Sequence, residues 1–165
     1  MMLKGNFWIC LVVLFIIPWS GWAKNDGNME SVSGQLEQLR HNPDNLPALH
    51  DVCFYYLKKS DYNKAILYAG KLLTASSSAG NDRYRVYAEI CLGQAYTMTG
   101  NIKEAFRNLS HAELMGVETK NDSALCSVYN GLGLYALNIQ NDYYRSLDYF
   151  FKGIDTVSYT HLRAH

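Results

Sequence analysis

Few side chains of this sequence could take part in catalysis or bind a metal, and none stands at the spacing of a known catalytic motif. Three histidines outside the last nine residues, His41, His50 and His111, lie in different segments. Asp51 follows His50 directly, and neighbouring residues of a helix point about 100° apart, so we expect no His–Asp dyad. We expect His111, near the end of a helix, to be solvated or to interact with the C-terminal end of the helix dipole. These positions predict no metal site.

Short motifs that carry a chemical mechanism are absent as well. The chain has no phosphate loop of the form GxxxxGK[ST], no GxGxxG, HExxH or CxxC, and no GxSxG nucleophile turn. We therefore expect no enzyme activity in this chain and no cofactor.

The cysteines do not form a disulfide framework. Cys10 lies in an N-terminal segment that we expect to be removed, which leaves Cys53, Cys91 and Cys126. An odd number of cysteines at helical positions does not indicate pairing. We expect three buried free thiols.

The charges exclude one class of partner. The chain has 15 basic and 15 acidic residues, and its longest basic run is Lys58-Lys59. Nucleic-acid binding depends on clustered Lys and Arg that neutralise phosphates. We therefore expect no nucleic acid to bind this segment.

The elements that must position these side chains follow a repeated pattern. In its clearest copy, Gly93 stands in the middle of a predicted helix, where Gly costs about 1 kcal/mol relative to Ala. This cost indicates the close approach of a second helix, with Ala105 as the matching small residue. Gly100 and Asn101 predict the end of the first helix through a left-handed residue. The copy consists of Leu92, Gly93, Tyr96, Ala105, Leu109 and Ala112.

Two further copies flank this one. The preceding copy has Cys53 at the position of Gly93 and a turn at Ser60-Asp61; it consists of Leu49, Val52, Cys53, Tyr56, Tyr62, Ala65, Ala69 and Leu72. The following copy has Ala136 in place of an aromatic residue and a turn from Asn138 to Asn141, one residue longer. It consists of Tyr129, Leu132, Gly133, Tyr143, Ser146, Phe150 and Gly153. The equivalent small residues Ala65, Ala105 and Ser146 follow one another at a nearly constant interval along the chain.

This pattern resembles the tetratricopeptide repeat, whose helix–turn–helix units carry small and large residues in this order. The usual unit has about 34 residues and the period here is about 40 residues, so the resemblance is to a longer-helix variety. It implies an all-α fold, a right-handed superhelical stack of antiparallel helix pairs. We expect three repeats, at about residues 46–80, 82–118 and 122–156. Chance spacing in an ordinary helical bundle is the alternative.

The N-terminal residues read as a targeting segment. Lys4 precedes the apolar run Phe7 to Ile17, and Gly21 and Ala23 give a small-x-small end. These features are typical of a secretory signal peptide, which we expect at residues 1–23. An uncleaved membrane anchor is the alternative. The segment predicts an extracytoplasmic location, periplasmic or secreted.

Residues 24–45 should connect this segment to the repeats. We expect a polar leader followed by a short helix that caps the first repeat. The apolar face of that helix consists of Val32, Leu36 and Leu39.

The last nine residues, 157–165, read VSYTHLRAH and break the helical pattern. They resemble the translation of a sequencing adapter, so we expect a non-native tail and a native chain that continues beyond Asp155. We therefore exclude His161, Arg163 and His165 from the predicted sites.

The resemblance implies a ligand groove, because the first helices of this family line the concave face of the stack. The inward positions of the three copies are His50, Phe54 and Lys58; Tyr87, Ile90, Gln94 and Thr97; and Asn130, Leu134 and Asn138. A mixed polar and aromatic groove fits a peptide or a partner helix, and a solvated surface without a partner is the alternative. Co-chaperone members of the family hold a C-terminal carboxylate with Lys and Asn. The equivalent places here hold His50, Phe54, Ile90 and Gln94, so we do not expect chaperone tails as partners.

Together these features predict a function in protein–protein contact. The first hypothesis is the extracytoplasmic sensing part of a bacterial membrane-bound signalling protein, whose input regions the chain resembles. The second is a self-contained secreted or periplasmic adaptor without an output domain. An enzyme would need its active site outside this segment.

Overall fold

The computed structural model describes the backbone of residues 32–163 and the side chains of residues 32–156. The predicted signal peptide and the start of the leader lie outside these residues. Within the described range the backbone forms helices and turns and no strand, so the fold is all-α. The elements are α2 (Val32–His41), α3 (Leu46–Lys58), α4 (Tyr62–Ser78), α5 (Asp82–Thr99), α6 (Ile102–Glu118), α7 (Asp122–Tyr135), the π-helical turn η2 (Ala136–Gln140) and α8 (Tyr143–Arg163).

Each turn between α3 and α7 is built in the same way, from a left-handed residue followed by Asn or Asp. The left-handed residues are Ser60, Gly80, Gly100 and Lys120, with φ between 50° and 78°. The next residue caps the following helix, because its side chain accepts a hydrogen bond from a backbone N–H three residues later. Its own N–H donates to a carbonyl five residues back, which closes the preceding helix. Because these turns are evenly spaced along the chain, the helices between them have similar lengths.

The extra residue of the last repeat lies in a helix and not in a turn. The sequence pattern predicted a longer turn from Asn138 to Asn141, but residues 136–140 form the π-helical turn η2. The left-handed residue is Asn141, with φ 53°, and Asp142 caps α8 by accepting from the Arg145 N–H at 2.9 Å. A π-helical turn takes up one additional residue per turn, so the standard left-handed and capping turn is kept. The predicted position of this turn was therefore wrong.

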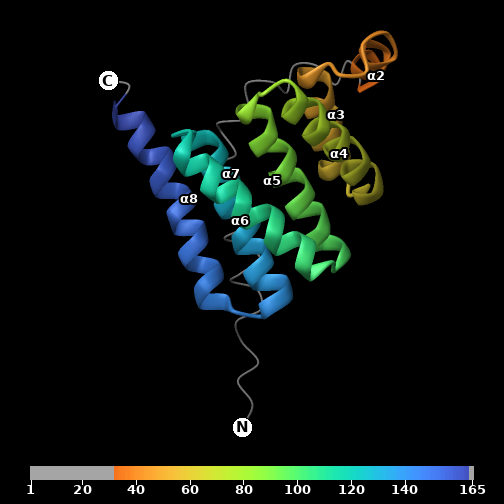
Figure 1. Cartoon of the computed structure of the whole chain (residues 1–165). Coiled ribbons are helices and arrows are strands. Elements are labelled where there is room, and N and C mark those ends of the chain that lie inside the picture. The colour runs from red at the N-terminus through yellow and green to blue at the C-terminus, as the bar shows by residue number, and fades with distance from the viewer. Residues whose placement is uncertain (1–31, 164–165) are drawn as a thin grey trace. The chain divides into compact units, whose positions relative to one another are not determined.

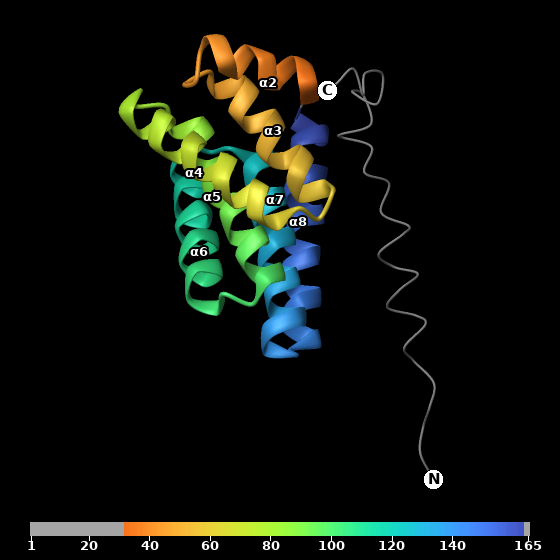
Figure 2. The same cartoon turned by 90° about the vertical axis from the view of Figure 1, so that its right-hand side faces the viewer.

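The helices pack in consecutive pairs. Each second helix contacts its own first helix and the next first helix, as α4 contacts α3 and α5, and α6 contacts α5 and α7. Successive first helices also contact one another, α3 with α5 and α5 with α7, whereas no comparable contact joins α4, α6 and α8 in the described part of the chain. In Figure 1 the colour changes across this stack from α2, in orange, to α8, in blue, at the opposite edge. Figure 2 shows α6 and α8 on opposite sides of α7.

Small residues allow the paired helices to approach closely. A Cβ atom on Gly93 would lie 2.6 Å from Leu109 Cγ, and one on Gly133 would lie 2.8 Å from Phe150 Cδ1. The packing reason expected for Gly93 is therefore present, and the atoms nearest to such a methyl group belong to Leu109. Ala105 is fully buried beside this contact. The core comprises two clusters, one between α3, α4 and α5 and the other mainly between α5, α6 and α7.

The two ends of the described range differ. Helix α2 contacts α3 but has no fully buried residue. At the other end, α8 remains helical to Arg163, so the change of sequence pattern at Val157 does not end the helix. Between residues 32 and 163 no helix is both apolar enough and long enough to cross a membrane.

Candidate functional site

The predicted groove residues differ widely in their exposure. Lys58, Asn130 and Asn138 are exposed, while His50, Phe54, Gln94 and Leu134 are half-buried. Tyr87, Ile90 and Thr97 are buried, with exposed fractions of 9%, 0% and 3%. Because successive first helices contact one another, the positions on α5 that face its neighbours are covered. These three residues belong to the core, and assigning them to an open groove was wrong.

Two of the groove residues on α5 are already engaged within the chain. The Thr97 hydroxyl donates to the Gly93 carbonyl at 2.9 Å. The Gln94 amide donates to the Ser127 carbonyl on α7 at 3.2 Å. Gln94 therefore joins two first helices, which leaves less of its hydrogen-bonding capacity for a ligand.

An aromatic cluster surrounds His50 where α3 meets α5. The imidazole centroid lies 4.9 Å from the Phe54 ring, 5.1 Å from Tyr87 and 6.0 Å from Tyr84. Its Nδ1 lies 2.9 Å from Asp51 Oδ1, so the two side chains do meet, contrary to the expectation from their positions on a helix. The angle of about 100° describes only the directions of the two Cα–Cβ bonds, and the rest of each side chain can still turn toward the other. The cluster offers a stacking and hydrogen-bonding surface.

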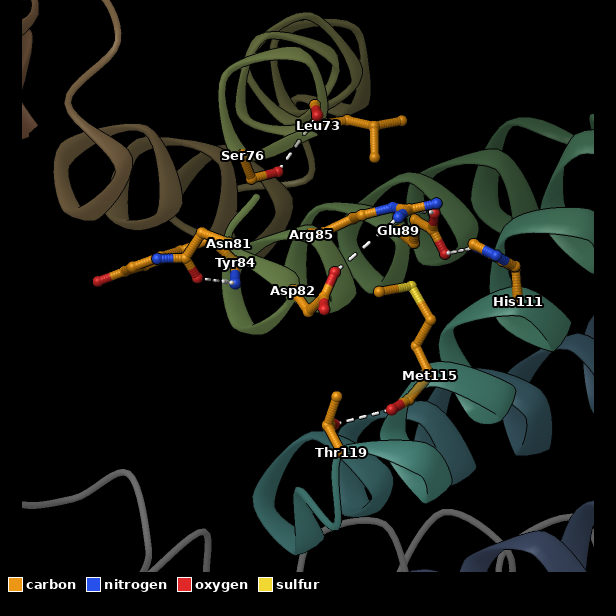
Figure 3. A network of polar contacts seen from close by, with 10 residues as sticks. All are labelled: Leu73, Ser76, Asn81, Asp82, Tyr84, Arg85, Glu89, His111, Met115 and Thr119. Atoms are coloured by element: carbon orange, nitrogen blue, oxygen red, sulfur yellow. Dashed lines mark hydrogen bonds and ion pairs between the residues drawn. The ribbon is translucent and has the colours of Figure 1, made fainter. Parts of the chain in front are cut away.

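A close polar contact between a buried carboxylate and a half-buried imidazole joins α5 to α6, and the sequence did not predict it. Glu89 is 5% exposed, and its carboxylate lies 2.5 Å from His111 Nδ1 (Figure 3). Arg85 Nε lies 4.0 Å from the same carboxylate and is buried without a hydrogen-bond partner in the described part of the chain. Burial raises the pKa of Glu89, although the hydrogen bond from His111 and the nearby guanidinium groups of Arg85 and Arg107 act to lower it. His111 is thus a partner of Glu89, with a side chain that stays 41% exposed, so the expected solvated position holds and the contact with Glu89 is added to it.

The repeat alignment contained a signal for this pair. Glu89 stands at the position occupied by Leu49 and Tyr129 in the other copies, one period away on either side. An acidic residue at a position that is otherwise apolar indicates a buried partner. The partner itself could not be read from the sequence, because it lies on the following helix, well beyond the reach of local spacing rules.

The thiols are largely as expected. Cys53 and Cys91 are free and fully buried, whereas Cys126 is free and half-buried. Burial, with the neighbouring Cys91 thiol, raises the pKa of Cys53 well above its ordinary value, and burial also raises the pKa of Cys126. A raised pKa lowers the thiolate fraction and hence the reactivity. These thiols are therefore packing groups.

One shallow cavity of about 380 Å³ lies between α2, α3 and α4. Its lining is apolar apart from two cations at Arg40 and Lys71; the other residues are Leu36, Leu39, Pro43, Leu49 and Tyr68. Arg40 is paired with Glu37 at 3.2 Å, and the Lys71 ammonium lies 5.2 Å from the centre of the Tyr68 ring. No group of three or more metal-ligating side chains occurs among the residues that the structure describes.

Comparison with known proteins found no matching family model, no matching curated protein and no matching solved structure.

Proposed function

We propose that residues 46–156 form a protein-interaction module of the tetratricopeptide type, a right-handed superhelical stack of three helix pairs. The pairs are α3–α4, α5–α6 and α7–α8. The observation that carries the proposal is the contact between successive first helices, α3 with α5 and α5 with α7. This contact places the first helices of neighbouring pairs side by side, which supports a shared binding face of the kind that stacked repeats form.

The accessible part of this surface defines the ligand. Asn130 and Asn138 are exposed amides, each able to donate and accept hydrogen bonds from a peptide backbone. Phe54 and Leu134 are half-buried and can contact apolar side chains, and Lys58 is an exposed cation at the end of α3. A peptide or helix with apolar anchors and an acidic residue near Lys58 fits this chemistry. We infer that the ligand is such a segment of another protein.

Peptide display tests the binding surface. Random peptides on phage are selected against the full chain, and the enriched peptides are measured on Phe54→Ala, Asn130→Ala and the control Leu114→Ala. Leu114 is 55% exposed on α6, away from the first helices. We expect at least a ten-fold loss of affinity in the two first-helix variants and no loss in the control, with circular dichroism confirming that all three fold. If no peptide is enriched, or if all variants bind equally, the proposed surface is wrong.

We further propose that the module works outside the cytoplasm, as the sensing part of a signalling protein. The support is the signal-like segment at residues 1–23 and the absence of catalytic motifs from the sequence. A self-contained secreted or periplasmic adaptor is the second candidate. Mass spectrometry of the exported protein should give an N-terminus at Lys24, and a product that keeps Met1 would favour the uncleaved anchor instead. The intact reading frame separates the two roles, because a sensor requires an apolar stretch of about 20 residues after the repeats.

A further inference from the structure

The cavity beside α2 lies in a space that the helices leave open. Helix α2 contacts α3, whereas no comparable contact joins α2 to α4 in the described part of the chain. The cavity of about 380 Å³ lies between them, with Leu36 and Leu39 of α2 and the buried Leu49 of α3 in its lining. Figure 2 shows α2 at the edge of the stack, next to α3. The apolar face of α2 therefore borders a cavity that is open to a ligand.

Two cations stand at this cavity, and none of its lining residues is acidic. Arg40 pairs with Glu37 of its own helix, but the two side chains are 79% and 56% exposed, and an ion pair of this kind contributes little. The Lys71 ammonium lies over the Tyr68 ring, and no carboxylate pairs with it among the residues that the structure describes. Both cations can therefore contact an anion that enters the cavity.

The second helix pair shows a carboxylate at the equivalent place. Glu89 stands one period after Leu49, and His111 stands one period after Lys71. In that pair the Glu89 carboxylate meets the His111 imidazole (Figure 3). The chain thus brings an acid to the equivalent of Lys71, from the position at which the first pair has an apolar side chain beside a cavity.

The third pair has the same two residues on its second helix, but its cation is already neutralised. Tyr149 and Lys152 are the equivalents of the tyrosine and lysine of α4, and the Lys152 ammonium again lies over its tyrosine ring, at 5.3 Å. Tyr129 replaces Leu49 and stacks on Tyr149 with centroids 6.4 Å apart. Lys152 pairs with Asp148 at 3.0 Å. Among the three described pairs, the first therefore combines an apolar residue at this position with a cation that no acid neutralises.

We propose that the cavity binds a small amphiphilic carboxylate, a molecule with an aliphatic body and one carboxylate group. The body lies against the leucines of α2 and α3, and the carboxylate lies at Lys71 and Arg40, as the Glu89 carboxylate lies at His111. An apolar cavity of about 150 Å³ holds benzene, so this larger cavity admits roughly ten to fifteen non-hydrogen atoms. A partner helix, about 10 Å across, is too wide for it. The ligand site shares no residue with the first-helix surface.

Three small molecules test the proposal on the full chain. Octanoate carries both chain and charge, 1-octanol carries the chain without the charge, and acetate carries the charge without the chain. Each is titrated at neutral pH into protein with isotope-labelled leucine methyl groups, whose NMR shifts report both the affinity and the site. The variants are Lys71→Gln, Arg40→Gln/Lys71→Gln and Leu36→Gln. The matched controls are Lys103→Gln, an exposed cation of α6, and Leu67→Gln, a leucine of α4 that is 54% exposed outside the cavity.

We expect saturable binding of octanoate with shifts at Leu36, Leu39 and Leu49, about ten-fold weaker binding of 1-octanol, and no saturation by acetate. Lys71→Gln should weaken octanoate binding about three-fold and the double variant about ten-fold, because each exposed cation contributes modestly. Leu36→Gln should weaken it about five-fold through lost apolar contact. Both controls should match the wild type. All substituted side chains are exposed or half-buried, so the fold should be retained, which circular dichroism checks.

Absence of saturable octanoate binding, or shifts confined to other leucines, would overturn the proposal. Equal affinity for octanoate and 1-octanol, or equal octanoate affinity in Lys71→Gln and Lys103→Gln, would also overturn it, because the cations would then recognise nothing. Peptides selected on the first-helix surface should bind the cavity variants as they bind the wild type, so this test and that of the proposed function can fail separately.

Discussion

Substitution of two helical glycines by alanine gives the sharpest test of how the helix pairs are held together. Gly93 and Gly70 both stand in helix interiors, Gly93 in α5 and Gly70 in α4. A methyl group on Gly93 would lie 2.6 Å from Leu109 Cγ and 3.2 Å from the Leu109 backbone nitrogen, whereas nothing lies within 4 Å of one on Gly70. The two variants therefore share the same local change and differ in the tertiary contact.

The magnitude follows from two opposing effects. Ala is favoured over Gly in a helix interior by about 1 kcal/mol, so Gly70→Ala should stabilise the protein by about that amount. Forcing a methyl group into a packed interface costs about 1–3 kcal/mol. Gly93→Ala should then change the free energy of unfolding by between about 0 and about −2 kcal/mol. The difference between the variants, about 1–3 kcal/mol, measures the helix–helix contact alone, because the helix propensity cancels.

Urea unfolding followed by circular dichroism measures both free energies. In thermal unfolding the difference corresponds to roughly 3–9 °C, at about 3 °C per kcal/mol for a chain of this size. A double-mutant cycle with Leu109→Ala should show a favourable coupling of about 1 kcal/mol, because the smaller side chain leaves room for the new methyl group. If Gly93→Ala is as stabilising as Gly70→Ala, the close approach of α5 and α6 at this point does not exist, and the packing account of the repeat is wrong.

Three further predictions concern the buried acid, the turns and the thiols. The pKa of Glu89 is raised in the folded state above its ordinary value of 4.5, so the folded protein binds more protons than the unfolded chain, and stability should fall as pH rises from 4.5 through the raised pKa. Glu89→Gln should flatten this fall when the free energy of unfolding in urea is measured from pH 4.5 to 7. Parallel plots of that free energy against pH for the two proteins would contradict the prediction. Lys120 adopts φ 50° and Gly100 adopts φ 78°, a left-handed conformation that is unfavourable for residues other than Gly. Lys120→Gly should therefore stabilise the protein and Gly100→Ala should destabilise it, each by about 1 kcal/mol in urea unfolding. Changes of the same sign in the free energy of unfolding would refute the turn assignment. In a Cys10→Ser background, Cys126 should react with a disulfide reagent in the native protein, and the two fully buried thiols only after unfolding; a fast reaction of all three would show that the core around α3 and α5 opens readily.

Local signals were sufficient to predict the helices and most of the turns. Gly100 was expected to end a helix in the left-handed conformation, and it does so with φ 78°. Asn101 follows it and caps the next helix, as an Asx side chain does at a helix start, where backbone N–H groups are left without partners. These effects act over four or five positions, so they can be predicted from consecutive residues of the sequence.

The candidate site was predicted less well. The helices α3, α5 and α7, predicted to be first helices, do contact one another in succession, but Tyr87 and Thr97 were assigned to an open face and are buried. Which side of α5 is covered depends on its contacts with α3 and α7, and these depend on how far each pair is rotated against the next. A helical period gives the faces of a helix but does not say which neighbour covers each face.

The sequence by itself determined that residues 32–163 are all-helical, with helix pairs that recur at a regular interval and a small residue at each close contact, because propensity, capping and hydrophobic spacing all act locally. Only the tertiary structure decided that Leu109 lies over Gly93, that Glu89 pairs with His111 across two helices, and that the extra residue of the last repeat is taken up as a π-helical turn. The first two features join residues that are distant in sequence. In the third, the conformational cost of the π-helical turn is offset by the packing of the helices around it. Such a balance exists only once the helices have been placed against one another.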